Sequence, residues 1–170
     1  MKEERWKQAL DDLERVWPRV NGMGPPPRPS PAPPPDPLPP PPPGGPLGEL
    51  IGLEERSEAL YHAMAQRSSG RAATTLNSLS ASSARLLRRL RTEAGLRGGD
   101  VRPPSEPVRI RSLNAAFRTV WELAERGEQA YQEASRRTSD PELARFYENA
   151  AETKRRQRRL LRELAGRVYT

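Results

Sequence analysis

The strongest constraint on the fold is an internal repeat, because two parts of the chain match each other at an offset of 70 residues. The segment LEERSEALYHAMAQRSS at 53–69 aligns with LAERGEQAYQEASRRTS at 123–139, and each contains a tyrosine at the same place, Tyr61 and Tyr131. Identities continue at this offset further along, where Arg88-Arg89-Leu90 matches Arg158-Arg159-Leu160. One helical hairpin cannot bury its apolar side alone, so the repeat predicts two hairpins packed as a four-helix bundle.

Four segments have apolar residues at helical spacing, near 47–68, 71–94, 110–138 and 141–168. The run Ser139-Asp140-Pro141-Glu142 is typical of a helix start, with a capping residue, proline in the first turn and an acid near the positive end. No alternating β-branched run competes, so we predict an all-α fold. The expected inward positions are Leu50, Glu54, Ser57, Tyr61 and Met64; Leu76, Leu79, Ser83, Leu86 and Leu90; Leu113, Phe117, Val120, Ala124, Gly127, Tyr131 and Ala134; and Phe146, Ala150, Thr153, Arg156 or Gln157, Leu160 and Leu164.

The first 46 residues differ in composition from the rest. Fifteen of the 20 prolines fall within 25–46, which predicts an extended, disordered linker over 22–46. We predict an amphipathic helix over residues 1–21. The helical bundle is expected over residues 47–170. The apolar stripe of that helix consists of Trp6, Leu10, Leu13 and Trp17. A helix this short is marginal alone in water, so we expect it to bind a protein partner or a second copy of the chain.

Composition excludes several classes of protein. The chain has no cysteine, which rules out disulfides, thiolate metal sites and a cysteine nucleophile. No apolar run approaches the roughly 18 residues of a membrane span. The charged N-terminus lacks the apolar stretch of a signal peptide. We therefore expect a cytoplasmic protein without a transmembrane segment.

Positive charge concentrates after residue 46, where 23 basic residues face 16 acidic ones. Two arginine clusters occupy repeat-equivalent places: Arg85, Arg88 and Arg89, and Arg155, Arg158 and Arg159. Such clusters can neutralise the phosphates of a nucleic acid or bind another anionic surface. They are also typical of a solvated helix face, and no recognised binding motif accompanies them. Nucleic-acid binding therefore stays an alternative.

The repeated hairpin, with a glutamate seven residues before a tyrosine and a basic-basic-leucine ending, resembles the ferritin-like superfamily, and rubrerythrin-type bundles in particular. The resemblance covers about 47–168 and implies a ferritin-like four-helix bundle. It also implies a di-iron or di-manganese centre, to which two helices each give one glutamate and the other two each give a Glu-x-x-His pair.

Read residue by residue, the matching positions have mostly lost their ligands. Glu54 is kept, seven residues before Tyr61. The other five positions hold Ala124, Ser83, Leu86, Thr153 and Arg156. A one-residue shift in the last helix gives Lys154 and Gln157 instead, and a basic side chain at the centre would repel a divalent cation. The single histidine, His62, is in no Glu-x-x-His motif. Glu54 is expected to pair with a cation across the bundle or to face solvent.

Three functional hypotheses follow. The favoured one is a degenerate ferritin-like domain without catalytic residues or a cofactor, which acts as an interaction or structural module. The second is a rubrerythrin-like peroxidase or ferroxidase with an iron or manganese pair on a non-standard set of carboxylates. These carboxylates would be Glu54, Glu55, Glu58, Glu125 and Glu128, with Glu152. The third is an arginine-rich binder of nucleic acid or an anionic surface.

Overall fold

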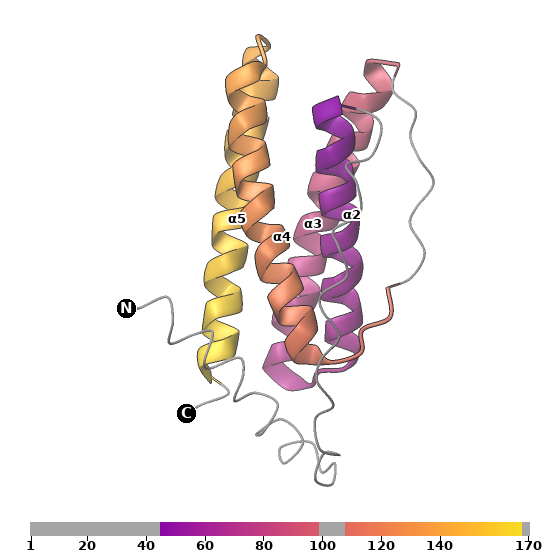
Figure 1. Cartoon of the computed structure of the whole chain (residues 1–170), viewed down its shortest axis with the longest axis vertical. Coiled ribbons are helices and arrows are strands. Elements are labelled where there is room, and N and C mark those ends of the chain that lie inside the picture. The colour runs from indigo at the N-terminus through magenta and orange to yellow at the C-terminus, as the bar shows by residue number, and fades with distance from the viewer. Residues whose placement is uncertain (1–44, 99–107, 168–170) are drawn as a thin grey trace, which may run out of the picture.

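The computed structural model describes residues 45–98 and 108–167. The predicted helix over 1–21, and the predicted linker up to residue 44, lie outside the described residues. The described part forms four helices and no strand: α2 (Gly45–Gln66), α3 (Gly70–Leu96), α4 (Leu113–Arg137) and α5 (Pro141–Arg167). They pack as a bundle, which confirms the all-helical class and the four predicted helices (Figure 1).

The helices form two antiparallel hairpins, α2 with α3 and α4 with α5. In Figure 1, α3 ends at the top of the bundle and α4 begins at the bottom, so these two helices run in the same direction. The closest packing is within each hairpin; between hairpins, α2 packs on α4, and α3 and α5 pack against each other least. α2 and α5 are not neighbours, so they can meet only through the centre of the bundle.

Local signals in the sequence fix where the helices begin. The Asp140 carboxylate accepts hydrogen bonds from the backbone N–H groups of Glu142 and Leu143, at 3.0 and 3.3 Å, which caps α5 as predicted. Ser112 caps α4 by accepting from the N–H of Ala115 at 3.1 Å. Gly70 has a φ of 56°, a left-handed conformation that favours glycine, at the turn between α2 and α3.

The core consists of two apolar clusters. One cluster includes Met64, Leu76, Phe117 and Leu161, and the other includes Leu50, Leu90, Leu143 and Tyr147. Buried polar residues also occur inside the bundle: Glu54 and Ser57 on α2, Ser83 on α3, and Lys154 and Gln157 on α5. The bundle therefore contains a distinct buried polar site.

The inward faces of α2 and α4 match the predicted pattern, and both Tyr61 and Tyr131 are fully buried. The predicted register of α5 is wrong by one residue. Burial in α5 matches α3 at an offset of 71, so that Ser83 corresponds to Lys154 and Leu90 to Leu161.

The cause is a one-residue difference between the hairpins, since α3 begins at Gly70 and α5 at Pro141. Four residues expected inside consequently lie elsewhere. Phe146 is half-buried, and its neighbour Tyr147 is buried instead. Thr153 is half-buried, the Arg156 side chain is 70% exposed, and Leu160 is 37% exposed. The sequence match between Arg88-Arg89-Leu90 and Arg158-Arg159-Leu160 therefore aligns residues in different surroundings, since Leu90 is buried and Leu160 is exposed.

Two adjacent leucines test this register. Leu161 is 2% exposed, so Leu161→Ala should lower the free energy of unfolding by about 2–5 kcal/mol, because it leaves a cavity in the core. Leu160→Ala, the matched control, should cost less than about 1 kcal/mol. Chemical denaturation followed by circular dichroism measures both. If Leu160→Ala lowers the free energy of unfolding more than Leu161→Ala does, α5 has the register predicted from the repeat.

Candidate functional site

A buried ion pair occupies the centre of the bundle. The Lys154 ammonium on α5 lies 2.6 Å from one carboxylate oxygen of Glu54 on α2, and neither side chain has any exposed surface. Because α2 and α5 are not neighbours, the pair joins the two hairpins across the centre. From the sequence, Glu54 was expected to pair with a cation across the bundle or to face solvent, and the structure shows the pair. The cation is Lys154, which lies inside because α5 is shifted by one residue from the predicted register.

Hydrogen bonds extend the ion pair to all four helices. The Tyr131 hydroxyl on α4 donates to the second oxygen of Glu54 at 2.9 Å. Lys154 Nζ also donates to the side-chain oxygen of Gln157 at 3.3 Å, and the Gln157 amide donates to Ser83 Oγ on α3 at 3.3 Å. We call these five residues, Glu54, Ser83, Tyr131, Lys154 and Gln157, the polar layer. It is connected throughout, as a buried charge requires.

Gly127 makes room for the lysine. A Cβ at this position would lie 3.2 Å from Cε and 3.3 Å from Cδ of Lys154, closer than most real contacts. The equivalent residue in the first hairpin is Ser57, whose hydroxyl donates to the Leu53 carbonyl of its own helix at 2.8 Å. A glycine inside α4 is unfavourable for the helix by about 1 kcal/mol, and here it lets the long Lys154 stem cross the bundle.

Tyr61 shows where the repeat has lost its symmetry. Tyr131 donates to Glu54, so the repeat-equivalent acceptor for Tyr61 is residue 124, which is Ala124. The buried Tyr61 hydroxyl accordingly has no hydrogen-bond partner among the described residues. Burial, together with the negative charge of Glu54, raises the pKa of Tyr61 well above its usual range. Burial also raises the pKa of Tyr131, and the charge of Glu54 and the hydrogen bond to it add to this effect.

The residues at the positions matched to metal ligands have separate surroundings. Ser83 and Ala124 are buried, Leu86 and Thr153 are half-buried, and Arg156 is exposed. Lys154 and Gln157, the pair given by the one-residue shift, take the inward places. Within 45–98 and 108–167, no group of three or more His, Asp or Glu side chains lies close enough together to hold a metal ion.

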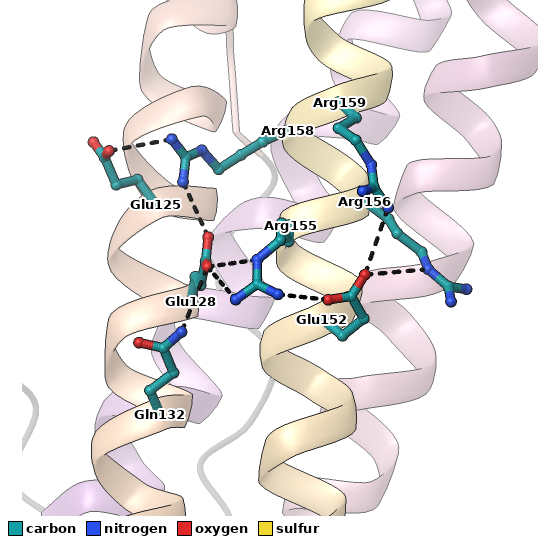
Figure 2. Close-up of polar contacts among 8 residues, drawn as sticks. All are labelled: Glu125, Glu128, Gln132, Glu152, Arg155, Arg156, Arg158 and Arg159. Atoms are coloured by element: carbon teal, nitrogen blue, oxygen red, sulfur yellow. Dashed lines mark hydrogen bonds and ion pairs between the residues drawn. The ribbon is translucent and has the colours of Figure 1, made fainter.

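The other candidate carboxylates lie away from Glu54. Glu55 pairs with Arg91 at 2.8 Å between α2 and α3. Glu58 is half-buried, and its backbone carbonyl accepts from Ser80 at 3.2 Å. Glu125 and Glu128 face α5 instead of the polar layer (Figure 2). The structure therefore does not bring these carboxylates together around Glu54.

Half of the predicted basic patch belongs to an ion-pair network between α4 and α5 (Figure 2). Glu128 lies between two arginines, 2.9 Å from Arg155 and 3.0 Å from Arg158. Arg158 also contacts Glu125 at 3.3 Å, and Arg155 contacts Glu152 at 2.8 Å. On this side of the bundle the positive charges are therefore largely balanced within the chain.

The other half of the patch lies on α3. Arg85, Arg88 and Arg89 are all exposed, and Arg89 pairs with Glu93 at 2.8 Å. His62 is exposed as well. The predicted partner-binding residues Trp6, Leu10, Leu13 and Trp17 lie outside the described residues.

Two features of the site were missed from the sequence. Lys154 begins a run of three cations, Lys154-Arg155-Arg156, which is typical of a helix surface, and a lysine is rarely buried without a partner. Trp121 was not singled out, yet the guanidinium groups of Arg158 and Arg162 lie over its ring at 5.0 and 5.7 Å from the ring centre. The shift of one residue considered for α5 was the available signal for Lys154.

Comparison with known proteins gives no relative: no family model, no curated protein and no solved structure matches the chain. None of the helices that the structure describes combines the length and the apolar character needed to cross a membrane.

Removing Lys154 alone should lower the free energy of unfolding more than removing both Lys154 and Glu54. Lys154→Met leaves the Glu54 carboxylate buried without a cation and should lower the free energy of unfolding by about 3–5 kcal/mol. Adding Glu54→Leu to Lys154→Met removes that stranded charge and should restore most of the loss. Denaturation of both single variants and the double variant completes a double-mutant cycle. If the losses simply add, the two side chains do not interact.

The two buried tyrosines should respond differently to loss of their hydroxyl. Tyr131→Phe removes a hydrogen bond to a carboxylate and should cost about 1.5–3 kcal/mol of unfolding free energy at pH 7. Tyr61→Phe removes a hydroxyl without a described partner and should cost less than about 0.5 kcal/mol or stabilise the fold. Urea denaturation of the two variants measures both free energies of unfolding. Equal losses would contradict the conclusion that only the Tyr131 hydroxyl is hydrogen-bonded.

Alkaline pH gives a second readout of Tyr61. Because its pKa is higher in the folded than in the unfolded state, the unfolded chain loses this proton first. The contribution of Tyr61 to stability should therefore be constant below the ordinary tyrosine pKa of 10.0 and fall above it, by about 1.4 kcal/mol per pH unit for each such tyrosine. Tyr61→Phe should reduce the slope between pH 10 and 11.5 by roughly that amount. An unchanged slope would show that Tyr61 ionises in the folded protein.

Proposed function

We propose that this chain is a degenerate ferritin-like bundle, in which an internal ion pair stands where the family holds two metal ions, and that it acts as a binding module. Two features support the ferritin-like origin. The bundle consists of two sequence-related hairpins, and the single long connection between them makes α3 and α4 run in the same direction (Figure 1). One long crossover of this kind is the connectivity of ferritin-like bundles.

The observation that carries the proposal is the position of the Lys154 ammonium. It lies 2.6 Å from Glu54, the one carboxylate kept from the family pattern. The other carboxylate oxygen is engaged by Tyr131. A divalent cation at this place would have to displace a buried positive charge, and the neighbouring Ser83 and Gln157 supply only neutral ligands.

The same geometry does not favour the peroxidase or ferroxidase hypothesis. Its carboxylates on α4 and α5, Glu125, Glu128 and Glu152, are held by arginines in the network of Figure 2. Glu54 itself is enclosed, with no exposed side-chain surface through which a peroxide or an iron ion would arrive. The polar layer is therefore best suited to holding the hairpins together.

The binding role rests on the parts of the chain outside the polar layer. Trp6, Leu10, Leu13 and Trp17 recur at helical spacing, and a helix of this length is marginal alone in water. A proline-rich stretch separates them from the bundle in the sequence. We propose that this apolar stripe binds protein. Arg85 and Arg88 are exposed and form no ion pair with the described residues, which keeps an anionic partner as the alternative.

Metal analysis tests this assignment. We expect the full chain, purified without chelators from cells grown with added iron and manganese, to contain far less than one equivalent of either metal. A di-iron protein of the ferritin-like superfamily, expressed and purified in parallel, is the control for metal supply. Stoichiometric iron or manganese, or a peroxide-dependent iron oxidation that chelators stop, would overturn the proposal.

A further inference from the structure

The segments that meet where α2 ends, and where α3 and α4 begin, carry no acidic residue. Residues 59–92 contain no aspartate or glutamate, and neither do residues 108–121. The end of α2 and the starts of α3 and α4 lie together at the bottom of Figure 1. The first turns of α3 and α4 accordingly have no acid, whereas α5 begins at the opposite end of the bundle with Glu142 in its first turn. Positive charge at the lower end is therefore not neutralised by its own segments.

Four exposed arginines lie on two neighbouring connections at this end. Arg67 and Arg71 flank the turn between α2 and α3, and Arg109 and Arg111 lie in the segment that leads into α4. The two connections are adjacent, because the Arg67 guanidinium donates to the Arg111 backbone carbonyl at 3.4 Å. We call these four residues the basal arginines. None of them forms an ion pair with any residue in 45–98 or 108–167.

Buried neighbours hold both connections against the bundle. Val108 and Ile110 pack into the core, whereas the alternate residues Arg109 and Arg111 are exposed. In the other connection, the Ser68 hydroxyl donates to a carbonyl of the last turn of α2 at 2.9 Å, just before the left-handed glycine that opens α3. The basal arginines are therefore presented to solvent by segments that the core positions.

Acids on the neighbouring turns do not balance these charges. The first acid of α4 is Glu122, in its third turn, and Glu163 is the only acid in the last two turns of α5. Both are exposed, and neither forms an ion pair with a basal arginine. At the opposite end of the bundle, by contrast, Arg97 pairs with Glu93 and with Asp140. The lower end therefore keeps an excess of positive charge.

The surface around the basal arginines is polar. The exposed large apolar side chains among the described residues are Leu96 and Leu160, and neither belongs to these segments. The start of α3 instead exposes hydroxyl and amide groups, on Ser69, Thr74, Asn77 and Ser78. A protein interface usually has a core that is poor in charge and rich in aromatic residues, whereas phosphates are bound by arginines together with hydroxyl and amide groups. This surface therefore suits phosphates better than it suits a protein.

We propose that the basal arginines bind the phosphate backbone of a double-stranded nucleic acid without reading its sequence. No aromatic side chain in the part of the chain that the structure describes is exposed, so an unpaired base has nothing to stack on here. Arginines that contact phosphates add to affinity but carry no sequence information. The surface uses no residue of the polar layer, of the predicted helix over 1–21 or of the arginine clusters predicted from the repeat, so this inference goes beyond the proposed function.

Binding of the full chain to labelled duplexes tests this proposal. Fluorescence anisotropy should show binding to a DNA or an RNA duplex of about 20 base pairs at roughly 50 mM salt. Four phosphate contacts predict a slope of about −3.6 for the logarithm of the binding constant against the logarithm of the salt concentration, so affinity should fall about 100-fold at roughly 200 mM salt.

Two variants that each remove four positive charges distinguish this surface from net charge. Replacing the basal arginines, in Arg67→Gln/Arg71→Gln/Arg109→Gln/Arg111→Gln, should weaken binding at least about tenfold at low salt and remove most of the salt dependence. The matched control removes exposed arginines elsewhere, in Arg85→Gln/Arg88→Gln/Arg136→Gln/Arg137→Gln. It should weaken binding less than about threefold, because charges further than a Debye length from the duplex are screened. Circular dichroism checks that both variants keep the native helix content.

The outcomes separate the possible anionic partners. Binding to either duplex that depends on the basal arginines supports the proposal, and the tighter duplex identifies the nucleic acid. Equal losses in the two variants, or no binding to either duplex at low salt, would overturn it. Vesicles containing phosphatidylserine are the third probe, and binding to vesicles alone would also overturn it. If the fourfold variant does not fold, Arg67→Gln/Arg71→Gln and Arg109→Gln/Arg111→Gln are measured separately, and each should weaken binding. The metal content of the bundle depends on none of these results, so a failure here is distinguishable from a failure of the proposed function.

Discussion

The contact between Lys154 and Glu54 is the interaction on which the rest of the bundle depends. Removing two charges from water costs several kcal/mol for each ion, and only close pairing with further hydrogen bonds offsets that cost. Tyr131 and Gln157 supply those bonds, and Gly127 supplies the room for the lysine stem. Because the pair joins α2 to α5, which are not neighbours, it also fixes how the two hairpins lie against each other. A rotation of α5 by one residue would place an uncompensated carboxylate in the core.

The internal repeat explains why two tyrosines lie at equivalent buried positions, and differences between the two halves explain why only one of them is hydrogen-bonded to a carboxylate. A symmetric bundle would have two equivalent tyrosine-carboxylate pairs, but this chain keeps one, because Ala124 stands where a second glutamate would be. The Glu54 carboxylate pairs with Lys154, and the Tyr61 hydroxyl has no hydrogen-bond partner among the described residues. The surface follows a different principle. Arg155 and Arg158 pair with glutamates between α4 and α5 (Figure 2). On α3, Arg89 pairs with Glu93 and Arg91 with Glu55, whereas Arg85 and Arg88 form no ion pair with the described residues.

Much of the fold could be predicted from the sequence, and the error in the site has a physical cause. The helical periods and the cap at Asp140 predicted four helices, and the inward faces of α2 and α4 followed from their apolar residues. In α5 the arginine-leucine matches at offset 70 suggested Leu160 as a core residue, yet surface arginines at similar spacing carry little information on register. The apolar pattern of Tyr147, Ala150, Leu161 and Leu164 fits the observed register better. Lys154 was not expected inside because its burial is favourable only with Glu54 opposite, a contact between residues 100 positions apart.

The most direct test of the central claim is a crystal structure of the full chain, grown with iron and manganese and measured at the absorption edges of both metals. The account predicts no anomalous peak between Glu54 and Ser83, and continuous density for the Lys154 side chain ending within hydrogen-bond distance of the Glu54 carboxylate. One or two anomalous peaks at that place, with Lys154 turned away from Glu54, would contradict it.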